Sequence, residues 1–173
     1  MQEFIELARQ RYSMRQFSAQ SVEEDKVLQL LEAARVAPTA CNYQPQKILV
    51  LNDEADMEAI RRSTRYHFYA PLVLIVCYDQ AVSWKNGFTG EDAGVLDAAI
   101  AATHIMLEAI SLGLGSTFVG HFDPKLIKEV FHMPQTVQPV AILPIGYPCA
   151  ETKINPLHTE KKPLRDLAVY HCF

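Results

Sequence analysis

The stretch that decides the fold is Asp92–Leu112, which reads DAGVLDAAIAATHIMLEAISL and is followed by Gly113. Alanine, leucine, methionine and glutamate are good helix formers, and no proline interrupts them. A helix of this length spans roughly 30 Å, about the diameter of a small domain. The polar residues fall on one narrow stripe, formed by Asp97, His104, Glu108 and Ser111. Because nearly every other position is apolar, we expect a helix buried in a core or against a partner.

The same stretch raises the alternative of a membrane span. Asp97, His104 and Glu108 stand well inside it, and the longest uncharged run is too short to cross a bilayer. We therefore predict a core helix that ends before Gly113 and Gly115, since glycine commonly follows a helix end.

Composition indicates an ordinary globular protein. The length of 173 residues predicts one domain over residues 1–173, and an apolar fraction of 49% is enough for a substantial core. The net charge of -4, with scattered basic residues, favours neither a nucleic-acid nor a membrane partner. No signal peptide is evident, so we expect a cytoplasmic location. The 4 cysteines and 6 histidines show no spacing typical of a disulfide framework or a metal site, and we predict no metal.

Strand and helix patterns alternate along the rest of the chain. Apolar runs predict a short strand at residues 47–51 and buried strands at residues 72–78 and 140–145, the run at 72–78 showing no alternation. Helical spacing and start signals predict helices at residues 22–36, at 53–62 and after Asp123-Pro124. Ser21 and Glu24 fit a capping box for the first of these. Because helices separate the strands, we expect a layered α and β domain.

Three short segments carry groups that can bind a ligand, and each also has a plain structural explanation. Arg11, Ser13 and Arg15 offer two guanidinium groups and a hydroxyl, which suit a phosphate or form a solvated basic turn. The loop from Pro38 to Pro45 offers amides that can pair with a heterocycle, although such residues are ordinary in turns. Gly120 lets a flat ligand approach the backbone closely, or is a turn glycine.

These segments in this order resemble the nitroreductase family of flavoproteins. The resemblance covers essentially the whole chain. The matching pieces are Arg11–Phe17, Ala37–Gln46, Asp97–Ala101, Gly113–Gly115, Val119–Pro124 and Pro144–Pro148.

The resemblance implies an FMN-dependent oxidoreductase that uses NADH or NADPH. Its fold would be an α+β three-layer sandwich, with a central mixed sheet flanked by helices and a long buried central helix. The protein would be a homodimer with two sites at the subunit interface. The C-terminal tail, about residues 150–173, would wrap the partner subunit.

The resemblance also assigns roles to residues of this chain. Arg11 and Ser13, with Lys161 or Lys162, would hold the FMN phosphate, and Arg15 would lie near the N1–C2 carbonyl edge of the flavin. Pro38, Thr39 and Ala40 would reach the ring from the partner subunit, while Asn42 and Gln44 would hydrogen-bond the flavin or its ribityl chain. Gly120 would offer its N–H to flavin N5. The full predicted set is Arg11, Tyr12, Ser13, Arg15, Pro38, Thr39, Ala40, Asn42, Gln44, Val119, Gly120, His121, Lys161 and Lys162.

Hydride transfer through FMN needs no side-chain nucleophile, which fits the absence of a G-x-S-x-G elbow. His121 is the one candidate for a catalytic side chain, because histidine can donate a proton near neutral pH. The expected electron acceptors are nitroaromatics, quinones or similar flat molecules. The alternatives are flavin fragmentation, reductive dehalogenation, or a flavin-binding storage or regulatory protein without turnover.

Overall fold

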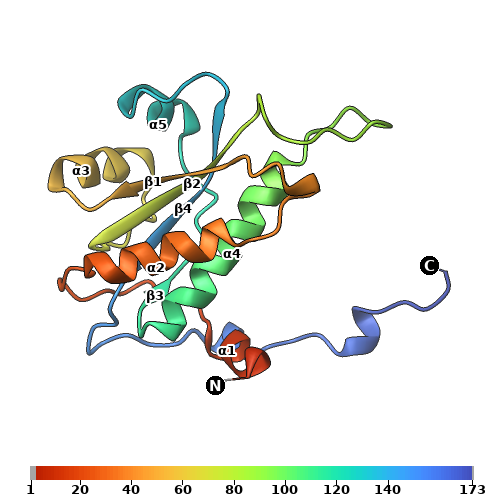
Figure 1. The fold of residues 1–173 in the computed structure, drawn as a ribbon. Helices are drawn as coiled ribbons and strands as arrows, with labels where there is room; N and C mark the ends of the chain where they lie inside the picture. Colours follow the sequence, from red (N-terminus) through yellow and green to blue (C-terminus); the bar gives the residue numbers. More distant parts are fainter. Residues whose placement is uncertain (1–2, 173) are drawn as a thin grey trace.

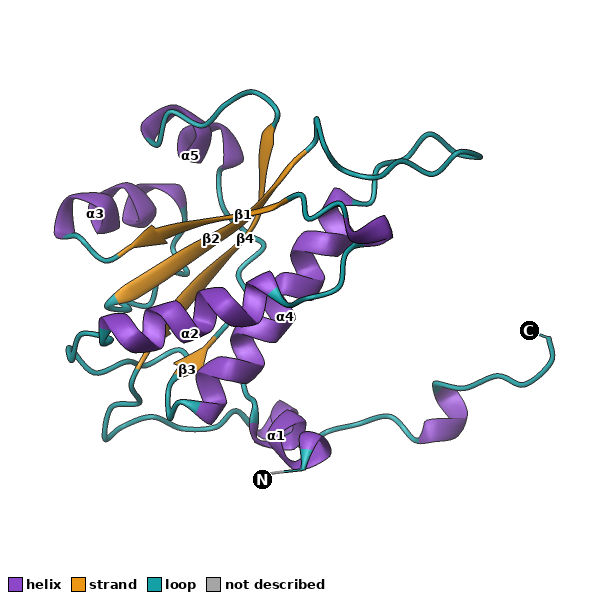
Figure 2. Cartoon of the chain, in the orientation of Figure 1, coloured by secondary structure: helices purple, strands orange, loops and turns teal. Residues whose placement is uncertain are grey.

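A four-stranded sheet forms the middle of the protein in the computed structural model, which describes residues 3–172 (Figures 1 and 2). The strands are β1 (Gln46–Leu51), β2 (Leu72–Asp79), β3 (Gly115–Ser116) and β4 (Val137–Gly146). Their order is β1-β2-β4-β3, and each neighbouring pair is antiparallel. The central strand β2 is buried along almost its whole length.

The sheet therefore differs from the expected mixed sheet. In the described part of the chain, the parallel pairing is confined to an isolated bridge between Ser13 and Ser116. A helix between two strands does not require them to be parallel. Here α3 (Glu54–Ser63) and the loop after it return the chain to the end of the sheet that it had left, so that Leu51 lies opposite Val73.

Helices cover both faces of the sheet and complete the expected three-layer sandwich (Figure 1). One face packs against α2 (Glu24–Arg35) and α4 (Gly94–Ser111), and the other against α3 and α5 (Pro124–Val130). Alternate residues of β2 enter the two cores, with Leu74 in the first and Ile75 in the second. Burial on both faces explains why β2 is an unbroken apolar run.

The helix start signals are confirmed in one place and wrong in another. Asp123 accepts hydrogen bonds from the backbone N–H groups of Lys125 and Leu126, at 2.9 and 3.1 Å, and so caps α5 as expected. The capping box at Ser21 is wrong, because α2 begins after Glu23 and has no side-chain cap. The Glu23 carboxylate instead accepts a 2.6 Å hydrogen bond from the hydroxyl of Tyr147.

The predicted central helix is confirmed as α4, but a single chain buries only one of its sides. The buried side carries mainly alanines, together with Ile105 and Asp97, and packs on the sheet and α2. On the other side Val95 and Leu96 are exposed to 49% and 66%. By length and composition α4 could cross a membrane, yet 44% of it is buried inside the chain. Its apolar character therefore serves the core on one side and leaves the other side open.

The chain leaves the sandwich after β4. The first helix, α1 (Phe4–Gln10), lies near the point where the tail departs (Figure 1). The tail contains two single-turn helices, η2 (Pro156–His158) and η3 (Leu164–Asp166). Beyond η2 it runs away from the body of the protein. Leu164, Leu167 and Tyr170 are about 80% exposed, so the residues that the structure describes leave the apolar part of the tail uncovered.

Candidate functional site

The segment after α1 is fixed to the sheet by one buried residue. Met14 is 1% exposed, and its backbone N–H donates to the carbonyl of Ser116 at 3.0 Å. A Cβ atom at Gly115 would lie 2.2 Å from the Met14 methyl carbon, so any larger residue there would force the buried Met14 side chain to move. In an extended segment successive side chains point to opposite sides, so burial of Met14 turns Ser13 and Arg15 outward.

A cavity of about 220 Å³ lies beside this segment, between it and the first part of the tail. It brings together the predicted phosphate-binding residues, although they are up to 150 positions apart in the sequence. Its lining is Arg11, Tyr12, Ser13, Arg15, Asn155, Leu157, His158 and Lys161. Lys161 lines the cavity, and Lys162 does not.

The positive charges of this cavity have no acidic partner. In the described part of the chain, Arg11, Arg15 and Lys161 form no ion pair. Arg15 donates to the carbonyl of Ser13 at 3.3 Å, and Lys161 donates to the carbonyl of His158. Arg9, just outside the cavity, is by contrast paired with Glu6 at 2.5 Å. Guanidinium and ammonium groups left without a carboxylate are suited to bind a phosphate, so the lining fits this group of FMN.

Of the tail residues that line the cavity, the sequence predicted Lys161 but not Asn155, Leu157 and His158. Asn155 accepts a hydrogen bond from the N–H of Leu157 at 2.9 Å and caps η2. This turn brings His158 within 2.9 Å of the carbonyl of Arg9 and edge-on to Tyr12, with 6.2 Å between ring centroids. Asn155-Pro156 is a cap followed by proline, which is a usable start signal for such a turn.

The ring of Tyr12 forms part of the wall of the same cavity. Burial raises the pKa of the Tyr12 hydroxyl above its ordinary value, and the nearby Cys149 adds to the effect. The hydroxyl donates a hydrogen bond to the sulfur of Met14 at 3.4 Å. Because its pKa is raised, it stays neutral and does not cancel the positive charge of the cavity.

The predicted loop residues from Pro38 to Gln44 lie elsewhere, at the opposite end of α4 (Figure 1). The buried carboxylate of Asp97 accepts a hydrogen bond from the N–H of Ala40 at 2.9 Å, and Thr39 accepts one from the N–H of Gln44 at 3.0 Å. Asn42 and Gln44 have positive φ angles of 55° and 51°. With Cys41, this loop has three non-glycine residues at positive φ. Such a strained backbone needs support from the surrounding structure. Within one chain, Pro38, Thr39, Ala40, Asn42 and Gln44 do not line the cation cavity.

The third predicted segment, which contains Gly120, starts beside the first, which contains Arg11, Ser13 and Arg15. The parallel bridge between Ser13 and Ser116 sets the start of segment 116–121 beside Ser13. Val119 exchanges two backbone hydrogen bonds of 2.9 Å with Ile142 and is buried. A side chain at Gly120 would meet only Phe118, at 3.9 Å, so one side of Gly120 is open. The ring of His121 packs edge-on against Tyr66, with 5.6 Å between centroids.

Comparison with known proteins supports the same family. The nitroreductase family model matches residues 8–68 and 61–147. A solved nitroreductase family protein from Clostridium difficile 630 is 33% identical with a TM-score of 0.93, over 99% of this chain and 100% of that one. An FMN-dependent nitroreductase from Clostridium difficile R20291 is 25% identical with a TM-score of 0.80, over 98% of this chain and 100% of that one. A protein of Methanothermobacter thermautotrophicus, described as an NADH dehydrogenase/NAD(P)H nitroreductase, is 30% identical over 151 residues, 83% of this chain and 76% of that protein.

The fold and the cavity together define an α+β sandwich protein with a cation-lined cavity at the edge of its sheet. The family match extends over both the sheet and the segment that carries Arg11 and Arg15. The chain belongs to the nitroreductase family, and it is an oxidoreductase.

Proposed function

We propose that this protein is an FMN-dependent, NAD(P)H-using oxidoreductase that reduces nitroaromatics, quinones or similar flat acceptors, and that it acts as a homodimer. The observation that carries the proposal is the cavity of Arg11, Arg15 and Lys161, whose charges have no carboxylate among the residues that line it. The similar protein from Clostridium difficile R20291 is named as FMN-dependent, and the one from Methanothermobacter as using NAD(P)H.

In this proposal the residues of the cavity hold the phosphate end of FMN. Arg11 and Lys161 supply charge from two sides, and Ser13 supplies a hydroxyl donor. The flavin ring would then extend along residues 116–121, because this segment starts beside Ser13. Arg15 lies along that path, and the open side of Gly120 leaves space for a flat ring.

The chemistry divides between cofactor and protein. Bound FMN supplies the hydride acceptance and donation, and the protein binds and orients it. Arg15 would place a cation where negative charge develops on reduction, and this charge would favour the reduced state of the flavin. No side chain of the cavity is required as a nucleophile, so the roles of the lining residues are binding, orientation and charge compensation.

The homodimer is supported by apolar surface that one chain leaves open. A groove of about 640 Å³ lies between α1, α2 and α4, and its walls include Phe4, Leu7, Val36 and Leu107. It adjoins the open side of α4. The exposed apolar residues of the tail form a second uncovered surface. Monomeric proteins rarely expose apolar patches of this extent. In the dimer, Pro38, Thr39 and Ala40 of one subunit are expected to reach the flavin of the other, which explains their distance from the cavity of their own chain.

The experiment is a turnover assay on purified protein reconstituted with FMN. We expect bound FMN, not FAD, and oxidation of NADH or NADPH that depends on added menadione or a nitroaromatic compound. A storage or regulatory flavoprotein would hold the flavin and give no turnover. A protein that binds no flavin would contradict the assignment of the cavity.

A further inference from the structure

A second basic cavity lies beyond Gly120, where α3 meets the start of α5. Its volume is about 590 Å³, and its lining includes Arg61, Arg62, Arg65, His121 and Asp123. These cations belong to neither the cavity of Arg11 nor the groove along α4. Of the three arginines, only Arg61 forms an ion pair within the described residues, so the cavity carries uncompensated positive charge.

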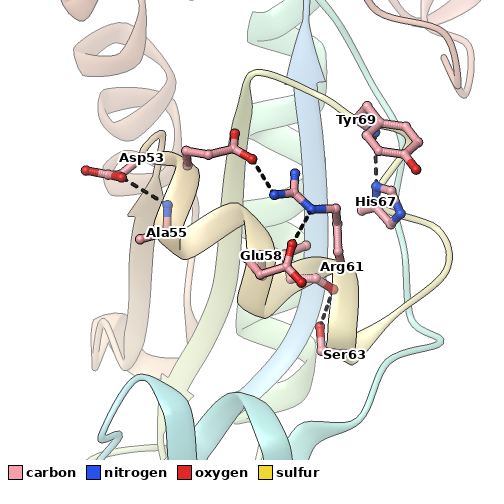
Figure 3. A network of polar contacts seen from close by, with 9 residues as sticks. Asp53, Ala55, Glu58, Arg61, Ser63, His67 and Tyr69 are labelled. Carbon is pink, nitrogen blue, oxygen red and sulfur yellow. Dashed lines mark hydrogen bonds and ion pairs between the residues drawn. The ribbon is translucent and has the colours of Figure 1, made fainter.

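The pairing of the three arginines differs. Arg61 is held between two carboxylates, that of Glu58 at 2.9 Å and that of Glu54, so its charge is compensated (Figure 3). Arg62 and Arg65 are exposed, and neither forms an ion pair in the part of the chain that the structure describes. Both are free to meet an anionic ligand.

The one carboxylate in the lining is already engaged. An oxygen of Asp123 accepts hydrogen bonds from the backbone N–H groups of Lys125 and Leu126, at 2.9 and 3.1 Å, and so caps α5. Its charge is thereby partly compensated by the end of the helix. The cavity keeps a positive balance, provided by Arg62 and Arg65.

Arg65 is held in place before any ligand arrives. Its guanidinium donates to the hydroxyl of Tyr66 at 2.6 Å and lies 4.8 Å from the centre of the Tyr66 ring. The Tyr66 ring also packs edge-on against the ring of His121, with 5.6 Å between the ring centroids. A guanidinium has five N–H donors, so one bond to Tyr66 leaves several for a phosphate. Fixing the side chain beforehand lowers the entropy cost of binding.

The cavity is joined directly to the segment that the proposed function places beside the flavin. The hydroxyl of Thr64 donates to the carbonyl of His121 at 2.6 Å, and the N–H of Asp123 donates to the carbonyl of Ser63 at 2.9 Å. These two bonds fasten the end of α3 to residues 121–123. A ligand that reaches the open side of Gly120 can therefore extend toward Arg62 and Arg65.

We infer that Arg62 and Arg65 form a subsite for a phosphate group of the reduced nicotinamide dinucleotide. The inference rests on the proposed function, because it needs the flavin near Gly120. The flat acceptors carry no phosphate, whereas the reductant carries a pyrophosphate and, in NADPH, also a 2′-phosphate. Planar guanidinium groups bind such oxygens through paired donors.

The test compares three reductants in anaerobic stopped flow on the FMN-loaded protein. Arg62→Gln/Arg65→Gln is expected to weaken the apparent affinity for NADPH about tenfold, the scale of a lost charge-assisted hydrogen bond. If the subsite holds the 2′-phosphate, NADH keeps its affinity; if it holds the pyrophosphate, NADH weakens equally. Reduced nicotinamide riboside, which carries no phosphate, keeps its affinity in both cases.

Lys125→Gln is the matched control, because it removes an exposed cation next to the cavity but outside its lining. If Lys125→Gln lost as much affinity for NADPH as the double variant, the subsite would be overturned, because the positive field of the whole surface would then explain the effect. Unchanged affinity for NADPH and NADH would also overturn it. So would loss of FMN from the double variant, which would make this cavity part of the flavin site.

A second measurement separates this inference from the proposed function. Calorimetry with adenosine 2′,5′-bisphosphate needs no turnover and no reducible flavin. Binding to the unmodified protein that weakens about tenfold in the double variant supports an anion subsite even if NAD(P)H reduces nothing. Absence of binding, or equal binding to both proteins, contradicts it.

Discussion

Arg11→Ala tests the phosphate site directly, because Arg11 lines the cation cavity and has no carboxylate partner within the described residues. The substitution removes a cation and its donors without stranding a protein anion, so the loss falls on the ligand. Hydrogen bonds to charged groups contribute about 1.5–3 kcal/mol, which corresponds to an FMN dissociation constant raised roughly 10- to 150-fold. Arg11 follows α1, which has no buried residue, so the fold is expected to survive the change.

The assay is fluorescence titration of flavin-free protein with FMN, at low and moderate salt. Arg9→Ala is the matched control, because Arg9 lies two residues away and is already paired with Glu6. We expect the control to bind FMN as the unmodified protein does. The salt dependence of binding should become weaker in Arg11→Ala, since one screened attraction is gone. Equal affinity in Arg11→Ala and Arg9→Ala, with both folded by circular dichroism, would refute the assignment of the cavity.

Four further predictions follow from single features. Gly115→Ala forces a carbon against Met14 and is expected to lower the free energy of unfolding by about 1–3 kcal/mol in urea titration; an unchanged midpoint would contradict the contact. Burial raises the pKa of Cys77 from 9.0 to about 12, so this thiol should resist Ellman's reagent at pH 8 in the folded protein, and unfolding free energy should fall as pH rises from 9 to 12, because only the folded state still binds the proton. Deleting residues 166–173 should weaken both the dimer and FMN retention in sedimentation experiments, and a stable monomer with full flavin would count against the dimer. His121→Ala should leave flavin reduction intact but slow reoxidation by a quinone on the order of 10²-fold; an unchanged rate of reoxidation makes His121 a bystander.

Most of the fold follows from local sequence patterns. The apolar run of β2 and the alanine-rich α4 were predictable because burial on both faces, or on a wide helix face, leaves an unmistakable composition. The sheet order and its antiparallel pairing were not, because they depend on where the loops after α3 and α5 return the chain. The capping box at Ser21 failed because α2 begins later than expected: Glu23 takes the N-cap position, and no side chain caps the helix.

The candidate site was predictable only where a short motif carries it. Arg11, Ser13 and Arg15 stand within five residues, so their grouping is visible in the sequence and their convergence with Lys161 was inferred from the family resemblance. His158 was missed, because its place beside Arg9 depends on the course of the tail. Likewise, nothing local shows that Arg61 is paired while its neighbour Arg62 is free; that difference appears only when α3 is folded.

An anaerobic single-turnover cycle tests most directly whether this protein catalyses both half-reactions, the reduction of FMN by NAD(P)H and its reoxidation by a flat acceptor. FMN-loaded protein is mixed with NADH or NADPH and followed near 450 nm, and a quinone is then added. The account predicts bleaching of the flavin by at least one of the two reductants, followed by full recovery of the absorbance with the quinone. A flavin that stays yellow with both reductants, or a bleached flavin that the quinone does not restore, would contradict it.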